Sequence, residues 1–85
     1  MDDTTRWWLR KLRHAAEDAV TGWDAESELA PWDCDRDIRY YARELGRCPG
    51  MEELANHAYT VGAYRTRLAD YVALLDDIWT YIHGC

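Results

Sequence analysis

Carboxylates at alternate positions are the first feature of this sequence that could do chemistry. Asp33, Asp35 and Asp37, followed by Glu44, match the ligand spacing of a calcium-binding EF-hand loop. That loop needs glycine at its sixth position for a sharp turn, and Ile38 stands there instead. We therefore interpret the three aspartates as the acidic start of a helix, where they complement the positive end of the helix dipole.

Cysteine and histidine side chains are the second possible ligand set. Structural zinc sites bring such ligands in close pairs along the chain, and only His83 and Cys85 come near that spacing. The other members, Cys34, Cys48 and His57, stand alone. Because three cysteines are an odd number, we expect reduced thiols, no metal site and no cofactor.

Signatures of catalytic machinery are missing from the sequence. It contains no G-x-S-x-G nucleophile elbow, no phosphate-binding loop, no H-E-x-x-H and no dinucleotide-binding glycine motif. Its 85 residues suffice for a single helical domain, residues 1–85, whose expected core positions are nearly all apolar. We expect no enzymatic activity.

The net charge restricts the kind of partner. Sixteen acidic and ten basic residues give a formal charge of −6, which opposes long-range attraction to phosphate groups. No apolar stretch approaches the roughly 18 residues of a membrane-spanning helix, and the first residues are acidic where a secretion signal would be basic. We expect a cytoplasmic protein that binds protein rather than nucleic acid or membrane.

Apolar side chains recur at helical spacing, so helices must position these groups. The spacing predicts helices over about residues 3–21, 32–46 and 51–83. The last helix carries the longest apolar stripe, which consists of Val61, Tyr64, Leu68, Tyr71, Leu75, Ile78 and Ile82, widened by Val72 and Trp79. Because residues 60–62 have poor helix propensity, we expect a kink near 60–62, with a complete break there as the alternative. The predicted fold is all-α, a small three- to four-helix bundle with a long C-terminal helix.

The junction between the second and third segments carries a motif. Residues 42–55, Ala-Arg-Glu-Leu-Gly-Arg-Cys-Pro-Gly-Met-Glu-Glu-Leu-Ala, resemble the ELGRxPxxEELA segment of bacterial sigma-factor region 3 and related helix-turn-helix proteins. The resemblance implies that Tyr64, Arg65 and Arg67 approach the major groove of DNA. Residues 59–62 stand out of register with the turn of that family, and the motif is also an ordinary helix end followed by a helix start. A DNA-binding regulator is therefore one alternative.

Basic residues form two stripes. One is on the first helix (Arg6, Arg10, Lys11, Arg13, His14), and the other is on the second helix (Arg36, Arg39, Arg43, Arg47). Cations in the first half of a helix oppose its dipole, so we expect a compensating group outside the first helix. One interpretation pairs the arginines within the chain, with the acidic connector between the first two helices and with Asp70, Asp76 and Asp77.

Aromatic residues are abundant, with five tryptophans and six tyrosines. Trp7, Trp32 and Tyr40 fall on polar faces of the predicted helices, where no core needs them. Such side chains are typical anchors of protein interfaces. For Trp32 and Tyr40 the alternative is that they cap one end of the bundle.

These observations favour a small acidic protein-interaction module. We expect a stoichiometric inhibitor of a larger host protein, in the style of phage anti-CRISPR or anti-sigma proteins, with its acids against a basic surface. The expected partner-binding residues are Trp7, Arg10, Lys11, Asp24, Glu26, Glu28, Trp32, Asp33, Asp35, Asp37 and Tyr40. The remaining alternative is an obligate oligomer, a homodimer included, that uses Ile78 and Ile82 in a coiled-coil seam.

Overall fold

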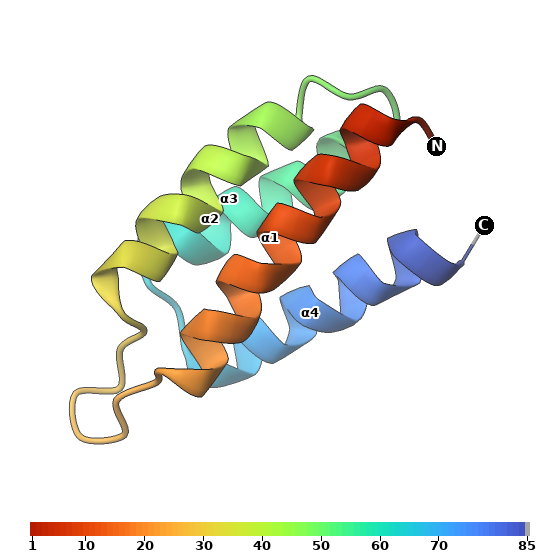
Figure 1. Cartoon of the computed structure of the whole chain (residues 1–85). Helices are drawn as coiled ribbons and strands as arrows, with labels where there is room; N and C mark the ends of the chain where they lie inside the picture. The colour runs from red at the N-terminus through yellow and green to blue at the C-terminus, as the bar shows by residue number, and fades with distance from the viewer. Residues whose placement is uncertain (85) are drawn as a thin grey trace.

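Four helices make up the computed structural model, which describes residues 1–84. They are α1 (Asp3–Thr21), α2 (Trp32–Leu45), α3 (Glu52–Tyr64) and α4 (Leu68–His83), and each runs back along the one before it (Figure 1). The described residues form no strand, which confirms the all-α prediction and selects four helices. None of these helices is both long enough and apolar enough to cross a membrane within residues 1–84.

Local signals explain both ends of α1 and the start of α2. The Asp2 side chain accepts a hydrogen bond from the Thr5 backbone N–H at 2.7 Å and caps the first turn of α1. Gly22 ends that helix, and Pro31 precedes α2. The predicted bounds of the first two helices are therefore confirmed to within one residue.

The predicted third helix is two helices, so the expectation of one continuous element over residues 51–83 is wrong. Its break lies at residues 65–67 and not near 60–62, which remain helical. Gly62 lies inside α3 at a point where α2 approaches closely. A Cβ at Gly62 would lie 3.0 Å from the Asp35 carbonyl oxygen. The glycine reflects packing between helices rather than a helix end.

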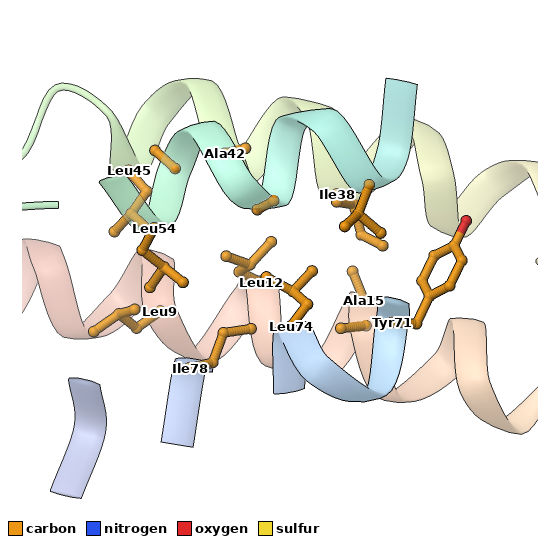
Figure 2. Packing of buried hydrophobic residues seen from close by; sticks show 14 of the residues in the cluster. Leu9, Leu12, Ala15, Ile38, Ala42, Leu45, Leu54, Tyr71, Leu74 and Ile78 are labelled. Carbon is orange, nitrogen blue, oxygen red and sulfur yellow. The ribbon is translucent and has the colours of Figure 1, made fainter. Parts of the chain in front are cut away.

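Apolar side chains from all four helices meet in one core (Figure 2). Its largest fully buried members are Leu9, Leu12, Ile38, Leu45, Leu54, Tyr71, Leu74 and Ile78. Alanines of α1, α2 and α3 are also buried in this core. α4 packs along α1 and α3, and it diverges from α1 towards the end where both termini lie (Figure 1).

Candidate interaction surfaces

The connector between α1 and α2 presents several of the predicted partner-binding acids. The side chains of Asp24, Glu26, Glu28 and Asp33 are exposed. Asp24 also orders the loop, because its Oδ1 accepts a hydrogen bond from the Glu26 backbone N–H at 2.9 Å. This hydrogen bond lowers the pKa of Asp24 below its ordinary value. The connector therefore carries negative charge on an ordered turn.

Asp35 does not belong to that acidic surface. It is fully buried, with 0% of its surface exposed, so the prediction that it faces a partner is wrong. Its Oδ1 accepts a hydrogen bond from the Tyr71 hydroxyl at 2.6 Å, and its Oδ2 accepts one from Arg65 Nε at 3.1 Å. We call Asp35, Arg65 and Tyr71 the buried triad.

The helical period explains why Asp35 is buried while its neighbouring acids are not. The buried face of α2 consists of Asp35, Ile38, Ala42 and Leu45. Residues two apart in a helix point about 200° away from each other, so Asp33 is exposed and Asp37 is half-buried. The spacing of Asp35 from Ile38 is the signal that places this carboxylate inside.

Arg65 holds the turn between α3 and α4. Its Nη2 donates a hydrogen bond to the Ala30 carbonyl oxygen at 3.2 Å, in addition to the bond from Nε to Asp35. The Arg65 backbone is left-handed, with φ of 50°, which costs a residue with a side chain about 1 kcal/mol or more. Hydrogen bonds to a buried carboxylate offset that cost. Arg65, which the helix-turn-helix resemblance placed near DNA, is bound here to Asp35 and to the Ala30 carbonyl oxygen.

Tyr71 brings α4 into the buried triad. Burial raises the pKa of Tyr71 above its ordinary value, and the hydrogen bond to Asp35 raises it further. The Trp23 ring packs edge-on against the Tyr71 ring, with centroids 5.7 Å apart. The connector, α2, the end of α3 and α4 therefore meet at one point. The core position predicted for Tyr71 is confirmed, although its polar partner stands 36 residues away and gives no local signal.

The predicted aromatic anchors lie on the surface. Trp7 is 50% exposed, Trp32 is 59% exposed and Tyr40 is 51% exposed. Lys11 Nζ lies 4.6 Å from the centre of the Trp7 ring, and the Arg36 guanidinium lies 5.1 Å from that of Trp32. Both contacts are cation–π interactions. The surface placement of the three anchors is confirmed, while their role in binding stays a prediction.

These anchors fall into separate groups. Trp7 lines a shallow hollow on α1 with Arg10, Lys11 and His14. Tyr40 lines a different hollow on α2, together with Asp37 and neighbouring arginines. Trp32 and Asp33 stand at the start of α2, beside the connector. The predicted residues therefore form several small patches rather than one continuous face.

Two arginines of α2, Arg39 and Arg43, have partners on α3 rather than in the connector. Arg39 Nη1 donates to the Gly62 carbonyl oxygen at 3.1 Å, and Arg43 Nη2 donates to the Tyr59 hydroxyl at 3.5 Å. The second contact lowers the pKa of Tyr59. Within residues 1–84, no arginine forms an ion pair with the connector acids or with an acid of α4. The interpretation that the two basic stripes are neutralised in that way is wrong for the described residues.

An apolar stripe on the outside of α4 is a surface that the sequence did not reveal. Its members, here called the outer stripe, are Leu68, Val72, Leu75 and Trp79. Leu68, Val72 and Trp79 are 37%, 43% and 59% exposed, so their assignment to the core is wrong. The centre of the outer stripe is about 100° around the helix axis from the buried side chains of α4. The two apolar faces are adjacent, so one periodic pattern covers both.

A hollow of about 310 Å³ lies between the first half of α1 and the last turn of α4. It is lined by Met1, Arg6, Leu9, Arg10, Arg13 and Ile82. Within residues 1–84, no carboxylate lies within 4.0 Å of Arg6 or Arg10. Arg13 Nε is buried and lies 3.6 Å from Glu17 Oε1 without forming a hydrogen bond. Three guanidinium groups therefore surround an apolar floor.

Metal ligands do not gather in the described part of the chain. No three side chains of His, Cys, Asp or Glu lie close enough to hold an ion within residues 1–84. Burial raises the pKa of the Cys34 thiol, which disfavours the thiolate that metals bind. His57 Nδ1 instead lies 2.7 Å from Asp77 Oδ2. Cys85, the partner of His83 in the predicted close spacing, lies outside the described residues.

Comparisons with known proteins found nothing similar to this chain. No protein-family model matches it, and searches of curated proteins and of solved structures each returned no match. Any conclusion about function therefore depends on the surfaces of the chain itself.

Proposed function

We propose that this protein is a non-enzymatic module that binds a larger protein. The observation that carries the proposal is the exposure of three tryptophans, Trp7, Trp32 and Trp79, each at least 50% exposed. Tryptophan exposes a large apolar area to water when it is left on a surface. In protein interfaces the same side chain is among the commonest sources of binding energy.

Stoichiometric inhibition is the form of this function that we propose. The exposed acids Asp24, Glu26, Glu28 and Asp33 would meet a basic surface of the target, and Trp32 beside them would supply apolar anchor area. Rim charges of this kind mainly accelerate and orient association, whereas the anchors set its lifetime. Asp35 has no part in this surface.

Affinity capture tests the proposal. The tagged protein is incubated with lysate of its native host, and captured proteins are quantified against the bait. We expect one host protein at close to equimolar amount, and its loss when the responsible anchor is replaced in Trp7→Ala, Trp32→Ala or Trp79→Ala. Glu52→Ala, an exposed position on α3 outside these surfaces, is the control. Absence of an equimolar host protein, or equal capture by all four variants, contradicts the proposal.

The outer stripe of α4 favours a second candidate, a homo-oligomer. Its members are spaced four, three and four residues apart, which is the pattern of a coiled-coil seam. Ile78 cannot serve in that seam because it is fully buried in the core. If the protein associates with itself, Val72→Glu should convert the oligomer to monomers in sedimentation velocity. A wild-type protein that sediments as a monomer removes this candidate.

A further inference from the structure

We propose that the groove between the diverging ends of α1 and α4 binds an acidic amphipathic helix of the partner protein. This inference rests on the proposed function, because it adds a second contact with the same partner: the groove would hold an acidic segment, at the end of the bundle away from the acidic connector. α1 and α4 separate towards their N- and C-terminal ends (Figure 1), and the hollow of about 310 Å³ lies there.

The floor of the groove is apolar. Half-buried Ile82 of α4 and Met1, which is 50% exposed, line the hollow, and Leu9 of α1, which also borders it, is fully buried. Trp79 stands about 60° around α4 from Ile82, and 59% of its surface is exposed. An amphipathic helix that enters this end of the bundle would cover Met1, Ile82 and Trp79 with its own apolar face.

The α1 wall of the groove is basic. Arg6, Arg10 and Arg13 are four and three residues apart, so they project from one side of α1 over about two turns. A second helix alongside can match this spacing with glutamates or aspartates three and four residues apart. Arginine suits the task, because its planar group forms paired hydrogen bonds with a carboxylate.

The bundle itself gains little from these arginines. Arg6 and Arg10 stand in the first half of α1, where cations oppose the helix dipole. Neither has a carboxylate within 4.0 Å in residues 1–84. Within residues 1–84, Arg6 and Arg10 are thus two neighbouring cations without a carboxylate partner in a chain with a net charge of −6. A ligand that brings carboxylates explains their placement.

Charge distribution favours an acidic protein helix over a nucleic acid. The hollow has a basic wall on α1 alone, and the chain as a whole carries a net charge of −6. A phosphate backbone carries charge along its whole length and would be repelled by this net charge. A helix with acids on one flank only can place them against α1 and keep them away from α4.

A matched pair of peptides tests the inference with the full-length protein. Each peptide is a helix of about three heptads with leucine at the a and d positions. One carries glutamate and the other lysine at the flanking positions that would face α1. Fluorescence anisotropy should show binding of the glutamate peptide at least ten-fold tighter than binding of the lysine peptide. Equal binding of both peptides, or no binding of the glutamate peptide, overturns the inference.

Charge-reversal variants locate the site. The double variant Arg6→Glu/Arg10→Glu should weaken binding of the glutamate peptide at least ten-fold. The matched control is Arg36→Glu/Arg47→Glu, which makes the same change in net charge at an exposed position of α2 and an exposed position of the turn after it. Equal loss in both double variants would mean attraction by net charge alone and would overturn the inference. The inference is also overturned if a single-stranded DNA oligonucleotide binds more tightly than the glutamate peptide and loses this binding in Arg6→Glu/Arg10→Glu.

The two proposals fail in different ways. If a host protein is captured by the wild type, depends on an exposed tryptophan and is retained by Arg6→Glu/Arg10→Glu, the function stands and this groove is not its site. If no host protein is captured, the proposed function fails whatever the peptides do. Circular dichroism of both double variants checks that the helices are intact.

Discussion

The two ends of this bundle differ in whether their charged side chains have partners inside the protein. At the connector end, the buried triad satisfies a carboxylate that is fully withdrawn from water and joins the connector, α2, α3 and α4. At the end with the termini, α1 and α4 diverge, and Arg6 and Arg10 have no acidic partner within residues 1–84.

This contrast separates residues that hold the fold from residues that are available to a partner. Binding surfaces are commonly drawn from the less stable parts of a protein, and α1 and α4 separate at the open end. The connector end is constrained by hydrogen bonds between distant segments. Substitutions at the two ends should therefore differ in sign as well as in size.

The largest expected effect is loss of the carboxylate in Asp35→Ala. Because the substitution leaves Arg65 and the Tyr71 hydroxyl without their acceptor, we expect it to lower the free energy of unfolding by about 3 kcal/mol. Urea denaturation followed by circular dichroism measures this change. Asp33→Ala, two residues earlier and exposed, should change stability by less than about 0.5 kcal/mol. Similar values for the two variants would contradict the buried triad.

A smaller loss is expected from Gly62→Ala. The added Cβ would lie 3.0 Å from the Asp35 carbonyl oxygen and 3.1 Å from the side chains of Arg39 and Ile38. Separation of α2 from α3 should cost about 2 kcal/mol. Gly46→Ala is the control, because its Cβ would meet nothing closer than 3.4 Å. Thermal unfolding of both variants measures the difference in stability. A stabilised Gly62→Ala would show that the close approach of α2 to α3 is absent.

Alkaline pH should weaken the connector end. The pKa of Tyr71 is raised in the folded state, so above about pH 10 the unfolded chain loses the Tyr71 proton first. The unfolded state then binds fewer protons, and stability falls as pH rises. Denaturation midpoints across this range should fall more steeply for the wild type than for Tyr71→Phe. Parallel profiles would mean that Tyr71 ionises as readily in the folded protein as in the unfolded chain.

The smallest effect should have the opposite sign and occur at the open end. Arg6→Glu replaces a cation near the positive end of α1 by an anion, so it should raise the free energy of unfolding by about 0.5 kcal/mol. The same single substitution should weaken binding of the acidic peptide. Urea denaturation and anisotropy measure the two quantities. A destabilised variant would mean that Arg6 supports the fold and is not held for a ligand.

Helix ends governed by local chemistry could be predicted from the sequence. Asp2 before α1, Gly22 after it and Pro31 before α2 act on their immediate neighbours. The break between α3 and α4 could not be predicted in this way. It depends on Arg65, whose partner Asp35 stands 30 residues earlier in the chain.

The candidate surfaces could be predicted where an apolar or aromatic side chain falls on the polar face of a helix. Trp7, Trp32 and Tyr40 are aromatic residues on polar faces, and each is exposed. Trp79 is an apolar residue in an apolar pattern, and no local rule separates it from the buried residues of α4. Its exposure depends on which of two adjacent faces packs inwards.

The turn at residues 65–67 decides between those two faces. One residue corresponds to about 100° of rotation about a helix axis, which is also the angle between the outer stripe and the buried side chains of α4. A rotation of α4 by this angle in one direction would carry Leu68, Val72 and Trp79 towards the core and turn Tyr71 and Ile78 outwards. Both rotations of α4 would bury apolar side chains, but only the observed one places the Tyr71 hydroxyl against the buried carboxylate of Asp35. Asp35 therefore selects the rotation of α4.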